Sequence, residues 1–402
     1  MSRPVAITGL GCISGLGHNV AENWEALSRG ASAIGSLSGF EESDLKVASA
    51  AQVRNYAPET SFQPTRLGLL DRHAQFVLIA TREAVEDAGL EASDLKTSAS
   101  IIGTGCGGKE TDELTYQKLY RDQKNRVHPF TIPRGMPSAA ASQVSMEMGI
   151  QGPCFTLSSA CASSNHAVAQ AVLMIRSGMV DVAVAGGTDA PFTYGLLKSW
   201  EALRVLSPDT CRPFSADRKG LVLGEGAGIV VLESLEHAQR RGATIRALIS
   251  GIGMSADASH ITDPSSEGAA SAMQAALNDA ALAPKDVSYI NAHGTGTQQN
   301  DTSETAAIRQ VFGDHADKLL VSSTKSMHGH ALGAAGAIEL VATVCSLQEG
   351  LIPPTANFTV PGEGCDLNYV PETAQDLEYK HALSNSFAFG GLNAVLAVSR
   401  HS

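Results

Sequence analysis

The sequence lacks the features that define several common protein classes. Its seven cysteines are odd in number and include no Cys-x-x-Cys pair, which argues against a disulfide framework and against a metal site. No apolar run approaches the roughly 20 residues that cross a bilayer. The first residues lack the apolar core of a signal peptide and are typical of a strand. We therefore expect reduced thiols, no membrane span and a cytoplasmic location.

Basic residues are also scarce, with 29 Lys and Arg against 41 Asp and Glu and a formal net charge of −12. Binding to phosphate backbones needs a basic face, so we expect no nucleic-acid partner. A negative net charge still allows a local basic patch, because a binding partner responds to the local electrostatic field. The 39 glycines gather in tight motifs such as 103–108, which indicates close backbone approach rather than flexible linkers.

What is present is an alternation of strand and helix patterns. Residues 153–157, 161–177 and 180–185 read as strand, helix and strand, a unit that predicts a parallel sheet. A similar order begins again after about residue 250. We therefore predict an α/β protein built from two similar halves, residues 1–245 and 246–402. Segments 35–68 and 109–136 show little periodicity and are expected to be excursions.

Cys161 lies where the predicted strand 153–157 gives way to the predicted helix. A thiol attacks as the thiolate, and a helix N-terminus offers partial positive charge and free N–H donors. The same junction can supply N–H groups for a developing oxyanion. A buried structural cysteine is the commoner fate of this residue type. Two distant histidine motifs favour the catalytic interpretation, in which Cys161 carries a thioester.

The two histidines sit in glycine-rich loops. His293 follows the predicted strand 287–292 in a Gly/Thr loop, at a strand end where α/β sites usually lie. His330 precedes small residues that begin a helix, a position that disfavours the imidazolium ion and keeps the ring neutral. A neutral ring can donate one N–H to an oxyanion. The neighbouring His328 is given a structural or surface role.

Two further features accompany these motifs. Lys325 and Glu339 flank His330, and a buried Lys–Glu pair there would orient the histidines, although a purely structural ion pair is an equal alternative. The C-terminal segment 384–393 places two aromatic residues beside a Gly-Gly turn. It is either a core strand that ends in a turn or a loop that closes over a pocket.

Together these motifs resemble those of β-ketoacyl-[acyl carrier protein] synthases of the elongating type, the synthase I and II group of the thiolase-like superfamily. The resemblance covers the chain from Val5 to Asn393. Its motifs are 159–161, 184–187, 212–214, 224–228, 293–297, 325–327, 329–330 and 385–387. Within the family, segments 134–140 and 198–206 resemble the rhizobial nodulation protein E branch, which makes unusual fatty acids for lipo-chitin signals.

The resemblance implies a five-layered αβαβα thiolase fold, a homodimer and an acyl carrier protein as partner. It implies that Cys161 takes the acyl chain, and that His293 and His330 promote decarboxylation of malonyl-carrier protein and stabilise the enolate. The carbanion then attacks the thioester. The substrates ride on the phosphopantetheine of the carrier, and no cofactor or metal is expected.

The resemblance also assigns supporting roles. Backbone N–H groups of Cys161 and Phe389 would form the oxyanion hole, with Phe389 as a gate. Lys325 and Glu339 would support the histidines. Thr295 and Thr297 would bind the phosphopantetheine arm. The acyl pocket would be lined by Cys106, Trp200 and Phe387. Ala388 and Leu392 depart from the usual glycine and threonine beside the gate.

The same residues bear on three rival functions. A thiolase uses a second cysteine near its C-terminus, but the last cysteine here, Cys365, does not precede the closing Gly-Gly turn. A non-condensing chain-length factor lacks the nucleophile, and Cys161 is present. A polyketide ketosynthase stays open as an alternative. Because carrier proteins of this pathway are acidic, a basic patch should steer them. Its candidates are Arg66, Arg72, Lys124, Arg126 and Arg204.

Overall fold

Ten of the described strands form one continuous sheet of two five-stranded halves. The structure is a computed structural model that describes residues 3–40 and 45–401. The first half contains β1 (Val5–Ser14), β4 (Ala99–Gly103), β5 (Cys154–Leu157), β6 (Val182–Asp189) and β7 (Gly226–Ser234). The second contains β8 (Ala247–Ala256), β9 (Tyr289–Asn291), β10 (Leu320–Ser322), β13 (His381–Ala388) and β14 (Leu392–Ser399).

The two halves repeat one topological plan. The strand order is β5-β4-β6-β7-β1 in the first and β10-β9-β13-β14-β8 in the second. In each half the outer three strands run parallel, and the next two pair antiparallel. A short antiparallel pairing of β1 with β8, limited to Val5–Ile7, joins the halves. The predicted pair of similar α/β halves is therefore present, whereas the boundary at residues 245 and 246 stays a prediction.

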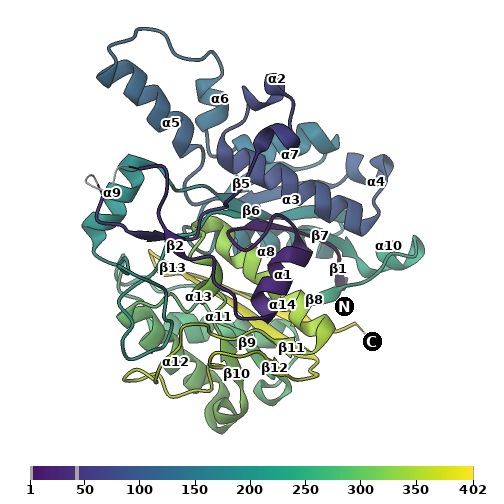
Figure 1. Ribbon diagram of the computed structural model, residues 1–402. Helices are drawn as coiled ribbons and strands as arrows, with labels where there is room; N and C mark the ends of the chain where they lie inside the picture. The colour runs from purple at the N-terminus through teal and green to yellow at the C-terminus, as the bar shows by residue number, and fades with distance from the viewer. Residues whose placement is uncertain (1–2, 41–44, 402) are drawn as a thin grey trace.

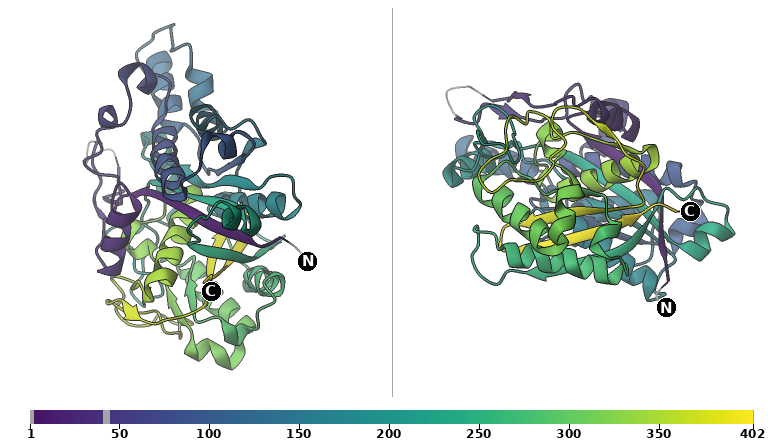
Figure 2. Two further views of the ribbon diagram at one scale, coloured as in Figure 1. Left: turned by 90° about the vertical axis from the view of Figure 1, so that its right-hand side faces the viewer. Right: turned by 90° about the horizontal axis from the view of Figure 1, so that it is seen from below.

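Helices lie on both sides of each half-sheet and between them (Figures 1 and 2). Helices α3 (Arg72–Ala88) and α7 (Ala139–Met148) cover the outside of the first half, and α11 (Ser266–Asp279) and α12 (Gln298–Phe312) cover the second. The helices α8 (Ser163–Arg176) and α14 (Ala335–Glu349) pack between the halves. This order of layers is the αβαβα arrangement that was expected.

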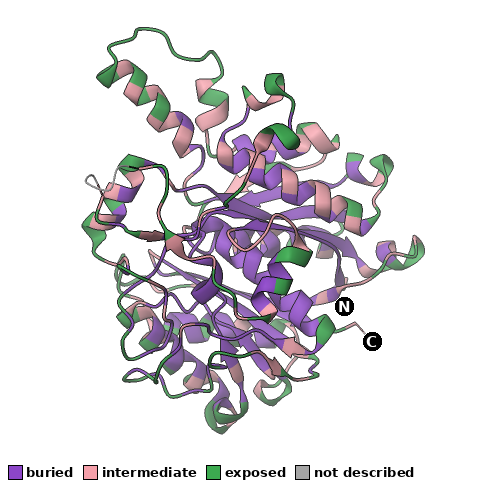
Figure 3. Cartoon of the chain, in the orientation of Figure 1, coloured by how far each residue is buried: buried purple, intermediate pink, exposed green. Residues whose placement is uncertain are grey.

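The middle layer is the most deeply buried part of the chain, as Figure 3 shows. Helix α14 is buried from Ala335 to Leu347, as expected for a helix that is apolar on all faces. Close approach of strand and helix depends on small residues there. A Cβ added to Gly228 of β7 would lie 2.5 Å from backbone atoms of α14, so only glycine fits.

The remaining elements are shorter and lie around this core. They are the helices α1 (Val20–Ser28), α2 (Pro64–Leu67), α4 (Ala92–Lys96), α5 (Lys109–Tyr116), α6 (Thr131–Gly135), α9 (Tyr194–Leu203), α10 (Leu235–Arg240) and α13 (Lys325–His328), and the strand pairs β2 (Gly35–Ser36) with β3 (Ser49–Ala50) and β11 (Leu351–Ile352) with β12 (Gln375–Asp376).

Most element predictions hold to within a few residues, and the differences are local. Strand β1, which the first residues indicate, continues to Ser14 because it pairs with β7 along its length. Helix α8 begins at Ser163 rather than Cys161. Residues 41–44 of the predicted excursion 35–68 lie outside the described residues.

The second predicted excursion forms an arm. Helices α5 and α6 project from the body with the loop between them, and their surfaces are largely exposed (Figures 1 and 3). Several large apolar side chains of this arm are exposed, namely Leu114, Tyr116, Tyr120, Val127, Phe130 and Ile132. Within the described residues, no helix has the length and apolar character needed to cross a membrane.

Candidate active site

Cys161 sits in a tight turn between β5 and α8, two residues before the helix begins. The preceding Ala160 has a φ of 49°, a backbone conformation that non-glycine residues seldom adopt. The Ser163 hydroxyl stabilises the turn by donating to the Ala160 carbonyl at 2.6 Å and accepting from the Ser159 N–H at 2.9 Å. The Cys161 side chain is thereby fixed and is buried, with 7% exposure.

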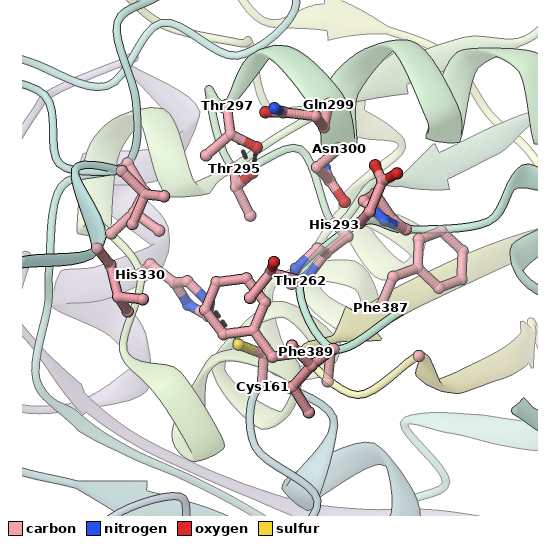
Figure 4. A pocket seen from close by; sticks show the side chains of 18 of the residues that line it. Cys161, Thr262, His293, Thr295, Thr297, Gln299, Asn300, His330, Phe387 and Phe389 are labelled. Carbon is pink, nitrogen blue, oxygen red and sulfur yellow. Dashed lines mark hydrogen bonds between the residues drawn. The ribbon is translucent and has the colours of Figure 1, made fainter. Parts of the chain in front are cut away.

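His330 contacts the thiol directly. Its Nε2 lies 2.9 Å from the Cys161 sulfur, as the dashed line in Figure 4 shows. The Leu332 N–H donates to the other ring nitrogen, Nδ1, at 3.3 Å. Since Nδ1 acts as an acceptor, the proton of the neutral ring resides on Nε2. His330 therefore presents an N–H toward the sulfur.

His293 completes the group from the end of β9. The Glu304 carboxylate accepts the backbone N–H groups of His293 and Gly294 at 2.9 and 2.8 Å, which fixes the loop. The His293 and His330 rings meet edge to face, with centroids 5.5 Å apart. The Cys161 sulfur and one nitrogen of each ring all lie within 4.8 Å of one another. The structure thus brings together the three residues predicted from distant motifs.

Burial sets the charge state of these groups. It lowers the pKa of both His293 and His330 well below the ordinary value, and the Lys325 ammonium lowers them further. Both rings are therefore neutral near pH 7. Burial also raises the pKa of the Cys161 thiol to about 12, opposed by Lys325 and by the backbone N–H of Phe389. Burial therefore opposes the thiolate that the helix N-terminus is expected to favour.

Lys325 and Glu339 form a fully buried ion pair behind the histidines. Burial raises the pKa of Glu339 to about 7, and the neighbouring ammonium opposes that rise. The positive charge of Lys325 lowers the pKa of Cys161, His293 and His330. The pair therefore acts on the site electrostatically as well as through packing.

A cavity of about 260 Å³ opens above Cys161 and the two rings (Figure 4). The hydroxyls of Thr295 and Thr297 lie 2.9 Å apart on its wall, next to Gln299 and Asn300. Apolar side chains form another part of its wall, namely Trp200, Leu203, Val205, Leu221, Phe387 and Phe389. The wall around Cys161 thus combines polar and apolar parts.

The positions predicted for an acyl pocket divide into two groups. Trp200 and Phe387 line the cavity as expected. Cys106 is set back from it and belongs to an apolar cluster with Trp200, Leu332 and Phe389. That cluster adjoins the cavity through Trp200 and Phe389, so Cys106 lies near the wall without lining the cavity.

The structure also shows the surroundings of His328 and Arg72. His328 is fully buried and bonds Thr324 at 2.9 Å, which makes it a structural residue rather than a surface one. Arg72 donates two hydrogen bonds to Glu225 and is half-buried, so its charge is already paired. It is therefore a poor candidate for the basic patch.

A cysteine and two histidines also form a ligand set that suits zinc. The hydrogen bond from the Leu332 N–H to His330 Nδ1 argues against this use. A histidine that binds metal through Nε2 keeps its proton on Nδ1 and donates it to an acceptor. Here Nδ1 accepts, so Nε2 holds the proton and has no free lone pair for a metal.

One part of the cavity was not predicted from the sequence. Residues 260–264, in the loop between β8 and α11, line its mouth together with Asn300. The Gly390 N–H donates to the Ile261 carbonyl at 2.7 Å, so this loop contacts the turn that carries Phe389. The available signal is its place after strand β8, because α/β sites gather at strand ends.

The site and fold agree with comparisons to known proteins. The β-ketoacyl synthase N-terminal domain profile matches residues 2–238, and the C-terminal domain profile matches residues 246–359. The chain belongs to the β-ketoacyl synthase family. It is therefore a condensing enzyme of the acyltransferase class, as its motifs predicted.

Individual relatives narrow this placement. The chain is 51% identical over 399 residues to nodulation protein E of Rhizobium leguminosarum bv. trifolii, covering 99% of both chains. It is 41% identical over 409 residues to 3-oxoacyl-[acyl-carrier-protein] synthase 2 of Staphylococcus aureus, again covering 99% of both. A solved complex of a type II polyketide acyl carrier protein with its hexaketide-bound ketosynthase superposes with a TM-score of 0.92, at 33% identity and full coverage of both chains.

Proposed function

We propose that Cys161 accepts the growing acyl chain from an acyl carrier protein. In this step the sulfur bonds to the acyl carbonyl carbon, the carrier thioester breaks, and the thiol proton leaves with the carrier thiol. The Phe389 N–H, which faces the sulfur, and the N–H of Cys161 itself stabilise the oxyanion of the tetrahedral intermediate. The Nε2–H of His330, 2.9 Å from the sulfur, stabilises negative charge there as the thiol ionises.

The two histidines then act on malonyl-carrier protein. The bond to the carboxylate carbon breaks, carbon dioxide leaves, and the electron pair becomes an enolate on the thioester. Neutral rings that donate N–H groups stabilise the enolate oxygen, and burial keeps both rings neutral. The enolate carbon attacks the Cys161 thioester, a carbon–carbon bond forms, and the sulfur departs. The product is a β-ketoacyl chain on the carrier.

The polar wall of the cavity suits the carrier's arm. Thr295 and Thr297 present hydroxyls next to the amide side chains of Gln299 and Asn300. A phosphopantetheine arm carries amides and hydroxyls that pair with such groups, and the apolar wall suits the acyl chain. No further cofactor enters this scheme, since the reacting groups belong to the chain and to its two substrates.

The carrier protein would dock on exposed basic residues near the cavity mouth. Arg204 follows α9, next to the cavity residue Leu203, and is exposed. Lys124 and Arg126 are exposed on the arm. Among the described residues these three make no ion pair, in contrast to Arg72. Free positive charge of this kind steers an acidic partner.

We also propose a homodimer formed through β5. In the described part of the chain this strand ends the sheet, so no neighbouring strand there pairs with the backbone groups on its outer edge. Phe155 on β5 and Met146 on α7 are exposed beside that edge. An open apolar edge favours pairing with another chain, and a second copy around a twofold axis would continue the sheet. Sedimentation velocity tests this: Phe155→Lys should give monomers, and an unchanged dimer would contradict the proposed edge.

The specialised pathway is a further part of the proposal. The 51% identity to nodulation protein E exceeds the 41% identity to the synthase 2 relative, which favours an acyl chain destined for a nodulation signal over housekeeping elongation. The cytoplasm, where carrier-bound substrates reside, is the proposed location. Elongation rates with a panel of saturated and unsaturated acyl-carrier proteins would distinguish the two pathways.

The observation that carries the proposed function is the contact of Cys161 with His330 and His293 at the base of a cavity with an apolar wall. The decisive experiment supplies labelled acyl-carrier protein and malonyl-carrier protein to the purified enzyme. A β-ketoacyl product with equimolar carbon dioxide is expected. Formation of neither product would refute the assignment of this site.

A further inference from the structure

Asp189, the last residue of β6, holds two loops of the site together. Its side chain is fully buried and accepts four hydrogen bonds. Oδ1 accepts from the Thr104 hydroxyl at 2.7 Å and the Cys106 N–H at 2.9 Å. Oδ2 accepts from the N–H groups of Gly105 and Gly333, both at 2.7 Å. Each carboxylate oxygen thus serves two donors, and the four donors come from two segments far apart in the sequence.

The bond to Gly333 acts on the segment that controls His330. Leu332 has a φ of 51°, a conformation that strains a residue with a branched side chain. Its N–H is the group that donates to His330 Nδ1. Such strain persists only where surrounding contacts fix the backbone. The hydrogen bond from the next residue, Gly333, to Asp189 is a contact of this kind.

The two loops fit together with little free space. A Cβ built on Gly333 would lie 2.4 Å from the Gly105 nitrogen and 2.7 Å from Asp189 Oδ2. The loops cannot slide past each other without breaking these bonds. On the Thr104 side, the same carboxylate fixes the turn of Cys106, which packs in one apolar cluster with Leu332.

We propose that Asp189 is a positioning residue that keeps the His330 proton on Nε2. The same carboxylate connects the His330 segment to the turn of Cys106, in the cluster beside the acyl cavity. The chain of contacts runs from the carboxylate through Gly333 and Leu332 to His330 Nδ1. If the Leu332 N–H turns away, Nδ1 can hold the proton instead. Nε2 then becomes an acceptor and cannot donate to an enolate oxygen.

This inference rests on the proposed donor role of His330, and its first test is independent of activity. Nitrogen-15 NMR of the histidine ring nitrogens reports which atom carries the proton. In the unmodified enzyme the His330 signal, assigned by its loss in His330→Asn, should show protonated Nε2 and bare Nδ1. A proton on Nδ1 would overturn the inference without any change at Asp189.

The second test uses Asp189→Asn, which keeps the shape but replaces one acceptor oxygen by an NH₂ group that faces N–H or O–H donors. We expect mixed His330 tautomers and a decarboxylation rate reduced roughly tenfold to a hundredfold, the scale of a misplaced catalytic group. Acylation of Cys161 should fall less. Asp71→Asn is the matched control, because Asp71 is also buried and accepts backbone N–H groups, yet lies away from the cavity.

The outcomes distinguish the proposed function of His330 from the positioning role of Asp189. Normal decarboxylation by His330→Ala would refute the proposed function. A large loss in His330→Ala, with an unchanged tautomer and rate in Asp189→Asn, would overturn only the role of Asp189. A loss of rate that Asp71→Asn shares, with an unchanged tautomer, would mean that Asp189 is only structural.

Discussion

The ring of Trp200 stacks on the ring of Phe389, with centroids 6.1 Å apart and planes inclined by 27°. Trp200 belongs to α9, and Phe389 lies in the turn after β13. Two glycines at positive φ, Gly390 and Gly391, complete that turn. An aromatic pair of this kind contributes about 1 kcal/mol beyond its buried area. The proposed gate therefore rests against a helix of the first half, and its opening has to break this contact.

Chain selection is expected to depend on the cluster behind this pair. Cys106 packs there with Trp200 and Phe389, so Cys106→Phe should push both rings toward the cavity. An apolar pocket discriminates by roughly 1–3 kcal/mol per methylene. The ratio of long-chain to short-chain elongation should therefore fall, and Cys106→Ala provides the small-residue control. An unchanged ratio in the phenylalanine variant would show that this cluster does not limit chain length.

Covalent labelling should depend on Cys161 alone. A cerulenin-like epoxide that occupies the acyl wall should label the enzyme once, and Cys161→Ala should remove the label, the acyl-enzyme and condensation. Cys154→Ser is the control, because Cys154 is an exposed thiol on β5 that does not line the cavity. Mass spectrometry after proteolysis locates the label. Retention of an acyl label in Cys161→Ala, with activity intact, would contradict the nucleophile assignment.

The half-reactions should separate at the histidines. His293→Ala and His330→Ala should still form acyl-enzyme at Cys161, but carbon dioxide release from malonyl-carrier protein should fall by about 10²-fold or more for a lost donor to the enolate. His315→Ala is a control, because His315 bonds the Val287 carbonyl away from the cavity. Single-turnover assays measure the two steps separately. Normal carbon dioxide release in both active-site variants is the contrary result.

Acid should destabilise the fold through His328. Burial, reinforced by Lys325, lowers its pKa to about 3, whereas a histidine in an unfolded chain titrates near pH 6.5. Below pH 6.5 the unfolded state takes up a proton that the folded state does not, so stability present above pH 6.5 is lost as the pH falls toward 3. Between pH 7 and pH 5 the free energy of unfolding should fall by about 2 kcal/mol more in the wild type than in His328→Gln. Urea unfolding of both proteins at the two pH values measures this difference, and equal losses would exclude it.

Carrier binding should depend on salt and on Arg204. Raising ionic strength from low to physiological should weaken binding, because exposed charges are screened beyond about 8 Å at 0.15 M. Arg204→Glu should weaken binding at low salt, whereas Lys285→Glu, an exposed charge change of the same kind, should not. Isothermal calorimetry with acyl carrier protein at two salt concentrations measures both effects. Carrier binding that is unchanged by salt and by Arg204→Glu would argue for an uncharged docking surface.

Much of the fold followed from the sequence because the core elements carry strong local signals. Helix α3 is capped by Gly89 in a left-handed conformation, and Asn19 caps α1, both residue types that favour helix ends. The three residues of the predicted centre were recognised from motifs that the fold then brings together. Such signals are local, so periodicity and glycine positions report them reliably.

What the sequence did not reveal depends on three-dimensional surroundings. Burial raises the pKa of Cys161, and its position before a helix gives no sign of that depth of burial. The start of α8 is delayed by the unusual backbone of Ala160, for which alanine itself gives no sign. Cys106 joins the cluster beside the cavity rather than its lining, and its turn is held by Asp189 from another strand. Contacts between distant segments decide all three.

The middle layer has a consequence for how the chain is made. Helix α8 packs Val168 and Ile175 in the same apolar core as Ile338 of α14 and Leu396 of β14. During synthesis, the first 245 residues therefore emerge from the ribosome before the residues of α14 and β14 that pack against α8. Until the C-terminal strands arrive, that apolar surface is open to other molecules. We expect the first half to complete its folding only after the C-terminal strands have been synthesised, with chaperone protection of the nascent chain until then.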